Sequence, residues 1–564
     1  MPRTKSKSKS KSKKQPTPEA PALSKKEQSA LKRKATQERE EFIGFTSATL
    51  FGSLFLGLFL FPFGGPKIAG GAVGAIVSIA LSYKYPRKAL WLFLIYMPFG
   101  GTVVYMLAGG NALLQVAKDA FYIPAAIALY QECKKKRLPF LLPKGLKTPL
   151  NILLGFCIVT LLLVNGSQQF ISKRPGEQPI AMGLLGLKVL LGYLPLIACA
   201  YYLIRSKREL LFLTRLHVVL AIICCVLGLA QYNMLLTGIC KSTEAFAVEG
   251  ADLFKASLEA KCLVGGSLLY STSQGVIRLP GTFVSPWHWA WFLISNACLT
   301  YATAFSDPNI FWRLGGLAGM AIVFVNAVIC GQRIALILVP IVIIILLILT
   351  GQIANLKRFI PIAVGLAVVI AIGMAMFPGI VQERLDSAVA RWNASPPTEF
   401  IASQAEFTSK GQEGIFGNGL GRATNSTRSF GKVKLIETYY PKLLYEIGPV
   451  GTIGFLALVT TLTVITFKIY RSVKEQNLRS FGASFWVFIL IISYNTYWYP
   501  LDTDPVAIYY WFLAGVILKL PEIEQQEQEK LKAALENEPE PKKKRNLNKS
   551  RVMSHEPEVK IQPS

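Results

Sequence analysis

Histidine, charged side chains and closely paired cysteines are all scarce in this chain of 564 residues. Only 17% of the residues are charged and only 3 are histidine, whereas a soluble globular protein carries about 25% charged residues. This deficit excludes an ordinary cytosolic enzyme. The 9 cysteines include no C-x-x-C pair, so the sequence indicates neither a zinc site nor a thioredoxin-like redox site. We expect no metal or other cofactor.

Apolar residues are abundant instead, and positive charge gathers at the two ends of the chain. Apolar residues make up 52% of the sequence, and the formal net charge is +28. The tails 1–41 and 521–564 are polar and rich in Lys, so neither forms a hydrophobic core. Beside a membrane, such tails bind anionic lipid with about 1 kcal/mol per basic residue. We therefore expect membrane lipids as partners, and no nucleic acid.

The part between the tails, residues 42–520, divides into apolar runs of the length that crosses a bilayer. No small-residue cleavage site follows the first run, which we interpret as an uncleaved span. The pattern predicts an all-α polytopic membrane protein with about 14 transmembrane helices. We expect them at 42–63, 68–83, 88–108, 111–130, 150–164, 181–203, 210–232, 286–305, 311–330, 334–350, 358–378, 446–469, 481–499 and 505–520.

An even number of spans places both termini on one side of the membrane. The short loops on that side carry most of the Lys and Arg of the membrane domain, so both termini are predicted to be cytoplasmic in the inner (plasma) membrane. Two long loops, 233–285 and 379–440, are then external, and the apolar spacing from Val381 to Trp392 predicts an amphipathic helix in the outer headgroup layer. The short external loops carry only Lys67, Lys173, Arg174 and Arg333.

Cys240 and Cys262 both lie in the first external loop. Disulfides persist outside the cytoplasm, and a bridge between these two residues would close a loop of about 20 residues, a constraint worth about 3 kcal/mol. The sequence leaves the paired and the unpaired state open.

Three charged residues, Lys118, Asp119 and Lys188, fall within predicted spans. A charge at that depth costs about 2.5 to 3.5 kcal/mol on insertion scales, so each needs a reason to be there. At 1.5 Å per residue, all three lie roughly 11 Å below the outer surface. Two interpretations stay open: a buried Asp119–Lys188 ion pair that joins two helices, and a polar cavity that opens to the outside.

Two arginines are expected at the outer ends of spans. Arg278 precedes the span 286–305, and Arg333 stands in the turn Gly331-Gln332-Arg333. Either residue alone fits an arginine that reaches lipid phosphate with no further role. Two at one cavity fit a lipid diphosphate better, because the planar guanidinium binds phosphate oxygens bidentately.

The second external loop holds a run of glycines between Gly411 and Gly421, followed by Arg422. The spacing is not G-x-G-x-x-G and no strand precedes it, so it indicates a tight backbone turn rather than a nucleotide loop. Glu437 and Glu446 follow. A carboxylate beside a cavity serves as a general base worth about 10²- to 10⁴-fold in rate, although an acid near a helix start is also common for structural reasons.

Two further motifs give weaker signals. His288 lies between Trp287 and Trp289, where an aromatic belt at the membrane interface is the simplest interpretation. The tripeptide Asp502-Thr503-Asp504 matches the D-x-D of metal-dependent sugar transferases, but it is a weak indication when it stands alone.

Taken together, these motifs resemble the O-antigen ligase and polymerase superfamily, bacterial membrane glycosyltransferases that act on polyprenyl-diphosphate glycans outside the inner membrane. Residues 278–283 resemble its Arg-x-x-Gly-Thr-Phe motif, and 331–333 its small-residue/Arg turn. Residues 414–421 resemble its glycine-rich turn, and 437–448 the block before its Glu-x-Gly helix start. The ligase branch has His where this chain has Glu437. With its Lys/Ser-rich N-terminal tail, residues 42–45 and the loop 84–91, the chain also resembles the hormogonium polysaccharide biosynthesis proteins of filamentous cyanobacteria.

The resemblance implies an inverting, metal-independent glycosyltransferase of exopolysaccharide biosynthesis. Its donor would be a polyprenyl-diphosphate-linked glycan and its acceptor a glycan or lipid, with other export proteins as further partners. The implied roles are diphosphate binding by Arg278, Arg333 and Arg422, proton acceptance by Glu437, and a cavity floor formed by Lys118, Asp119 and Lys188. A transporter or flippase is an alternative, although the chain shows no half-to-half repeat. A non-catalytic scaffold also stays open, as do the sugars and the choice between polymerisation and ligation.

Overall fold

The computed structural model describes residues 25–107, 117–172, 175–246, 259–266, 268–269, 277–352, 396–497 and 499–536, with isolated residues at 109, 379, 382, 386, 389–390 and 392–393. Most of the two polar tails, the span predicted at 358–378 and more than half of the amphipathic helix predicted at 381–392 lie outside these residues.

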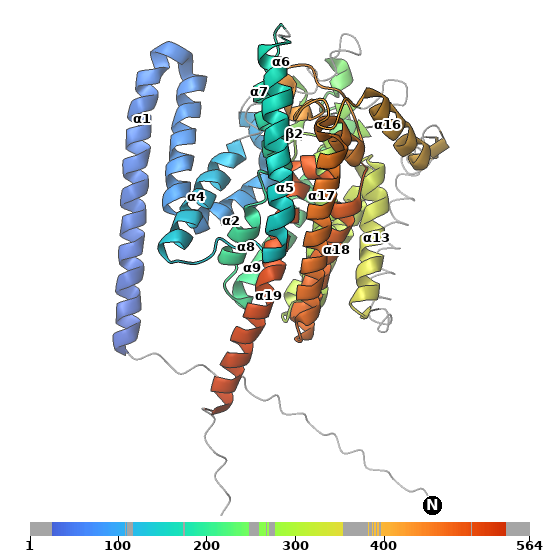
Figure 1. Ribbon diagram of the computed structural model, residues 1–564. Coiled ribbons are helices and arrows are strands. Elements are labelled where there is room, and N and C mark those ends of the chain that lie inside the picture. Colours follow the sequence, from blue (N-terminus) through green and yellow to red (C-terminus); the bar gives the residue numbers. More distant parts are fainter. Residues whose placement is uncertain are drawn as a thin grey trace, which may run out of the picture.

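Helices make up almost all of the described structure (Figure 1). The long ones are α1 (Lys25–Lys84), α2 (Pro86–Tyr96), α4 (Asp119–Lys135), α5 (Lys144–Thr160), α7 (Pro179–Leu191), α8 (Leu196–Leu203), α9 (Lys207–Leu236), α11 (Pro286–Ser306), α12 (Ile310–Ile329), α13 (Arg333–Leu349), α16 (Pro397–Gly411), α17 (Tyr439–Ser472), α18 (Gln476–Tyr494) and α19 (Asp504–Glu536). The shorter ones include α3 (Gly100–Thr102), α6 (Gly166–Phe170), η8 (Asn425–Phe430) and η9 (Pro500–Asp502). Two small antiparallel pairs join β1 (Lys261–Cys262) to β2 (Gly265–Gly266) and β3 (Leu268–Leu269) to β4 (Ile277–Arg278).

Within the described ranges, nine helical segments are long and apolar enough to cross a membrane, and two further apolar helices, Ile68–Lys84 and Arg333–Leu349, are shorter. The chain is therefore an all-α polytopic membrane protein. Every predicted span except 358–378 falls at least partly on a described helix. The total of 14 stays a prediction.

One predicted span has a different position. The apolar run 111–130 predicts a helix over that range, but α4 begins at Asp119 and continues to Lys135. Asp119 is thus the first residue of a helix rather than a residue in its middle. An acid in a first helical turn interacts favourably with the free N–H groups and the helix dipole, which a count of apolar residues does not detect.

Glycine and proline interrupt several helices. In α1 the chain folds back at Gly65, where φ is 68°, and the two arms of the helix stand side by side in Figure 1. In α17 the interruption is at Gly448, where φ is 66°, just before Pro449. Between α7 and α8 the chain leaves the helix over residues 192–195. Proline lacks the N–H that a helix needs, so these breaks follow from the sequence.

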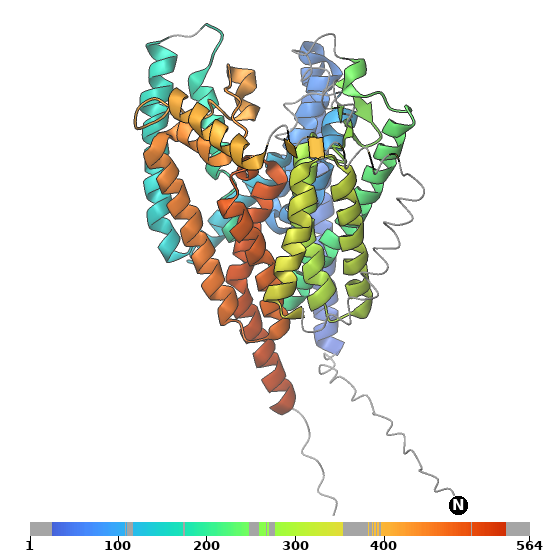
Figure 2. The same cartoon turned by 90° about the vertical axis from the view of Figure 1, so that its right-hand side faces the viewer.

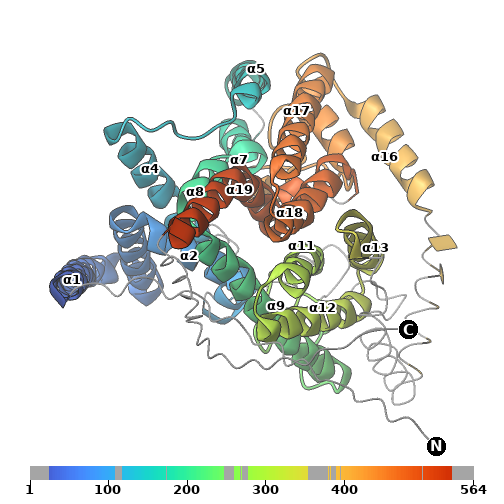
Figure 3. The same ribbon diagram turned by 90° about the horizontal axis from the view of Figure 1, so that it is seen from below.

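The core is built around α11. Its side chains from Trp289 to Thr303 are all buried, and it packs against α9, α12, α13 and α18, which surround it when the bundle is seen from below (Figure 3). This helix is apolar because it is enclosed by other helices.

The two ends of the bundle differ in chemistry. At the lower end in Figures 1 and 2, α1 begins and α19 finishes. Ion pairs join residues at the starts of α2, α9 and α18. Arg87 pairs with Glu209 at 2.6 Å, and Lys207 pairs with Glu475 at 2.5 Å. The opposite end carries the short strands and α16. These contacts hold the basic loops together on one face.

Candidate functional site

Arg278 and Arg333 are brought together by a backbone contact between two loops. Arg278 ends the strand β4, and the N–H of the next residue, Leu279, donates a hydrogen bond of 3.1 Å to the carbonyl of Cys330. Gly331 then reverses the chain with φ at 69°, a conformation that favours glycine, and α13 begins at Arg333. Arg333 therefore follows this reversal, and the backbone contact holds the end of β4, with Arg278, against the segment just before it.

Glu437 is held beside them by two other segments. Its N–H donates to Oε1 of Gln404 in α16 at 3.1 Å. The next residue, Thr438, forms an antiparallel bridge with Tyr497, and the N–H of Tyr439 donates to the carbonyl of Thr496 at 2.6 Å. The loop after α18 and the helix α16 thus fix the position of Glu437 just before α17.

The electrostatics of Glu437 connect it to both arginines. Partial burial raises the pKa of its carboxyl, and the positive charges of Arg278 and Arg333 oppose that rise. Among the described residues, its carboxylate makes no hydrogen bond or ion pair. The carboxylate therefore interacts with both guanidinium groups across a distance rather than through direct contact. We call Arg278, Arg333 and Glu437 the Arg–Glu site.

Two tyrosines that the sequence reasoning missed adjoin this site. Burial raises the pKa of Tyr497 and of Tyr499, and the charge of Glu437 raises both further. Tyr499 accepts a hydrogen bond of 3.0 Å from Nδ2 of Asn425 and has φ at 29°. A bulky residue with positive φ is strained, and such strain concentrates at functional sites. The aromatic run before Pro500, between α18 and α19, was the available signal.

Arg422 has protein partners for its guanidinium. Its side chain is buried, its NH1 pairs with Glu177 at 2.7 Å, and its Nε and NH2 donate to Oε1 of Gln168 at 2.8 and 2.6 Å. These partners favour a structural role over diphosphate binding, which stays a prediction for this residue. Arg422 joins the glycine-rich loop to the loop that follows α6.

The glycine-rich loop seals the break in α17. Pro449 has no N–H to donate to Tyr445, and the loop supplies the missing donors: the N–H of Asn418 binds the carbonyl of Tyr445 at 2.8 Å, and the N–H of Gly419 binds that of Glu446 at 3.1 Å. A Cβ on Gly417 would lie 2.6 Å from the nitrogen of Gly448. The glycines thus permit close backbone contact, in agreement with a tight turn rather than a nucleotide loop.

Glu446 is a buried structural residue and not an acid at a helix start. Its Oε1 accepts from the N–H of Ala423 at 2.7 Å and from the hydroxyl of Thr424 at 2.9 Å, and Lys442 lies 3.6 Å from its Oε2. Lys442 also pairs with Asp502. The sequence predicts Glu446 at the beginning of a span, whereas α17 begins at Tyr439.

The two carboxylates of the D-x-D motif pair with two different lysines. Asp502 pairs with Lys442, and Asp504 pairs with Lys118 at 2.9 Å. Within the described ranges, His, Cys, Asp and Glu form no group of three or more that would suit a metal ion. The two carboxylates therefore serve as ion-pair partners.

The charges predicted inside spans form one connected cluster. Lys188 pairs with Asp119 at 2.7 Å, and Lys118 pairs with Asp504. The hydroxyl of Tyr193 lies 3.2 Å from Asp119 and 3.1 Å from Asp504, which links the two pairs. The cavity beside Lys118 measures only about 30 Å³, space for little more than a water molecule. This geometry supports the ion pair that joins helices rather than a substrate cavity.

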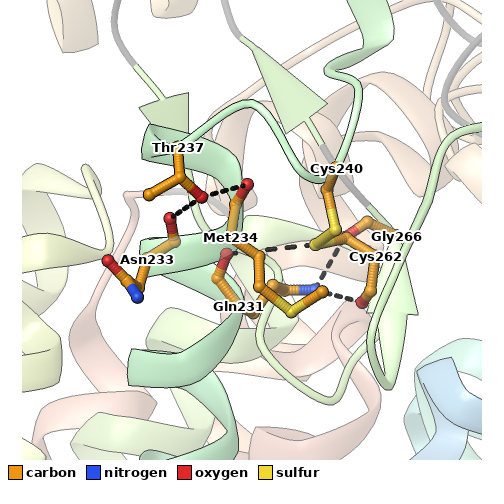
Figure 4. The surroundings of a disulfide bond; sticks show 7 residues. All are labelled: Gln231, Asn233, Met234, Thr237, Cys240, Cys262 and Gly266. Carbon is orange, nitrogen blue, oxygen red and sulfur yellow. Dashed lines mark hydrogen bonds between the residues drawn. A yellow bond between two sulfur atoms is a disulfide. The ribbon is translucent and has the colours of Figure 1, made fainter.

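Cys240 and Cys262 are joined as a disulfide in this structure (Figure 4). Cys240 follows the end of α9 and Cys262 lies in β1, with Cα atoms 5.4 Å apart. Nε2 of Gln231 in α9 donates to the carbonyls of Cys262 at 3.1 Å and Gly266 at 2.8 Å. The bond fixes β1 to the segment that follows α9.

The aromatic-belt interpretation of residues 287–289 is wrong for Trp289. This side chain is fully buried and stacks on Phe292, with ring centroids 5.5 Å apart. His288 lies 2.6 Å, through Nδ1, from the hydroxyl of Ser285, the residue that caps α11. A capping contact therefore accounts for its position.

A scan against protein-family models found no match for this chain, and a search of curated proteins found no significant match.

Proposed function

We propose that this protein is a membrane glycosyltransferase that transfers or polymerises a polyprenyl-diphosphate-linked glycan onto an acceptor glycan. The observation that carries the proposal is the Arg–Glu site. There the charges of two guanidinium groups lower the pKa of one half-buried carboxylate that makes no ion pair with a described residue. An anion-binding pair beside a proton acceptor matches the two needs of glycosyl transfer from a diphosphate donor.

In the proposed reaction, Arg278 and Arg333 bind the diphosphate of the donor. Their positive charges stabilise the negative charge that develops on the leaving oxygen as the bond to the sugar breaks. Glu437 accepts the proton of the acceptor hydroxyl while the oxygen of that hydroxyl bonds to the anomeric carbon. Because attack occurs opposite to the leaving group, the configuration at that carbon inverts. The products are the lengthened glycan and the polyprenyl diphosphate.

The raised pKa of Glu437 suits this role. Burial makes the carboxylate a stronger proton acceptor than an exposed glutamate, and the positive charges of the arginines limit the rise in its pKa. Tyr497 and Tyr499 lie in the same electrostatic environment. We assign them to the walls of the acceptor side of the site.

The proposal includes an orientation in the membrane. The face on which Arg87, Lys207 and their acidic partners meet is assigned to the cytoplasm under the positive-inside rule. The Arg–Glu site then faces outward in the inner membrane, where lipid-linked glycans are assembled into exopolysaccharide. The resemblance to hormogonium polysaccharide proteins supports an exopolysaccharide as the product.

The test is turnover by the purified protein in liposomes with a defined polyprenyl-diphosphate oligosaccharide. A transferred or lengthened glycan would support the proposed glycosyltransferase activity. Movement of the lipid across the bilayer without transfer would indicate a flippase, and neither outcome would favour a scaffold. Glu437→Gln should abolish transfer, whereas Glu399→Gln, at an exposed acid on the adjacent helix α16, should not.

A further inference from the structure

A second cavity lies at the other end of the bundle from the Arg–Glu site, where α4 is connected to α5. It has a volume of about 290 Å³, close to the lower limit of about 300 Å³ for small-molecule sites. The loop between α4 and α5 crosses the lower half of the bundle in Figure 1 and forms one wall. The lining residues are Phe140, Leu141, Leu142, Lys147, Asn151, Leu194, Pro195 and Ala198.

Six of the eight lining side chains are apolar, and two of the apolar ones belong to the break between α7 and α8. Leu194 and Pro195 lie where the chain has left the helix, and Ala198 follows in the first turn of α8. An uninterrupted helix would place a continuous row of side chains there. The break therefore contributes to an apolar hollow beside α5.

The two polar residues of the cavity, Lys147 and Asn151, stand one turn apart on the same face of α5. Both are exposed, and neither side chain makes a hydrogen bond or ion pair to another part of the chain that the structure describes. Two other cations, Lys136 and Arg87, do have anionic partners: Lys136 pairs with Glu132, and Arg87 pairs with Glu209. The cavity thus combines an apolar interior with an unpaired ammonium and amide.

The surrounding chain adds positive charge. Lys134 and Lys135 end α4, and Arg137 follows the helix. Basic side chains next to an apolar cavity between membrane helices are suited to a lipid whose headgroup is anionic. A zwitterionic headgroup would gain no net attraction from them.

We propose that this cavity binds one anionic phospholipid, with part of an acyl chain against Leu142, Leu194 and Ala198 and the headgroup phosphate at Lys147 and Asn151. The proposal does not depend on the glycosyltransferase activity, because the cavity shares no residue with the Arg–Glu site. The bound lipid would fill the hollow beside the break and hold the α4–α5 loop against α8.

The test uses the full chain purified in mild detergent and transferred to nanodiscs of phosphatidylcholine doped with spin-labelled phosphatidylglycerol or spin-labelled phosphatidylcholine. We expect a motionally restricted phosphatidylglycerol component that the phosphatidylcholine probe lacks. Lys147→Ala should weaken that preference about tenfold, since it removes a charge-assisted contact. Ala198→Trp, which fills the cavity, should also remove it.

Lys144→Ala is the matched control, because Lys144 is an exposed cation on the same helix that does not line the cavity. An equal loss in Lys144→Ala would show general surface attraction and overturn the proposal, as would an unchanged preference in Lys147→Ala. Added inorganic phosphate should leave the restricted component in place. Displacement by phosphate alone would mean that the site recognises a free anion rather than a lipid.

Discussion

The carboxylate of Glu446 accepts a hydrogen bond of 2.7 Å from the backbone N–H of Ala423, a residue 23 positions earlier in the chain. This contact joins the glycine-rich loop to α17 beneath the Arg–Glu site. The Arg422–Glu177 pair at 2.7 Å attaches the same loop to the segment after α6. The loop that precedes Glu437 is therefore fixed at two buried points.

We expect Arg422→Ala to destabilise the protein, because it leaves the buried Glu177 carboxylate without its cation. Loss of one member of a buried pair costs about 3 to 5 kcal/mol. Thermal unfolding of the detergent-purified protein should show a lower midpoint and a lower yield. Lys410→Ala, which removes an exposed pair with Glu406, should change stability by less than about 1 kcal/mol. An Arg422→Ala variant with normal stability and selective loss of turnover would restore the diphosphate role.

Arg278→Ala and Arg333→Ala should lower turnover without lowering stability, the opposite of Arg422→Ala. Each removes a charge-assisted contact to the proposed diphosphate, worth about 1.5 to 3 kcal/mol, so turnover should fall at least about tenfold while protein level is maintained. Lys at either position should restore only part of the activity, since the bidentate geometry is lost. Full activity in both alanine variants would leave only contact with lipid phosphate as their role.

Glu437→Gln should reduce turnover about 100-fold or more at unchanged protein level. The amide keeps the size of the side chain but accepts no proton, and a general base contributes about 10²- to 10⁴-fold. Near-normal turnover on purified lipid-linked substrate would show that the base is misassigned, and His288 or the substrate itself would have to supply it.

The pH dependence of transfer should follow the ionisation of Glu437. The base works when deprotonated, so kcat/KM should rise as pH increases through its pKa. The charge of Arg333 lowers that pKa, so in Arg333→Gln the pKa should increase and the rising limb should move to higher pH. Arg333→Lys keeps the charge and should leave the limb nearly in place. If the rising limb stays at the same pH in Arg333→Gln, the ionisation of Glu437 does not control kcat/KM.

The orientation can be tested with single cysteines. Ser409→Cys in α16 and Ser472→Cys at the end of α17 both replace exposed residues, and they lie at opposite ends of the bundle. An impermeant maleimide should label the first in intact spheroplasts and the second only after permeabilisation. The reverse result would place the Arg–Glu site inside the cell and exclude assembly of an external polymer.

Much of the architecture is determined by the sequence alone. Runs of apolar residues predict membrane helices because the lipid interior leaves backbone groups no partner outside the helix. Gly65 and Pro449 mark breaks that the structure contains, since proline removes a donor and glycine permits positive φ. Opposite charges predicted at equal depth, Asp119 and Lys188, do form a pair. These features depend on local chemistry or on depth in the membrane, both of which can be counted along the chain.

The tertiary structure alone decided which charged residues have partners. In the sequence Arg422 stands in an exposed-looking glycine-rich loop, but Glu177 and Gln168 occupy its guanidinium from about 250 positions away. Asp504 becomes the partner of Lys118 only because α19 begins where α4 begins. Glu446 is buried because a loop folds over it. Partners so distant in sequence are chosen by packing, and no local pattern of residues encodes that choice.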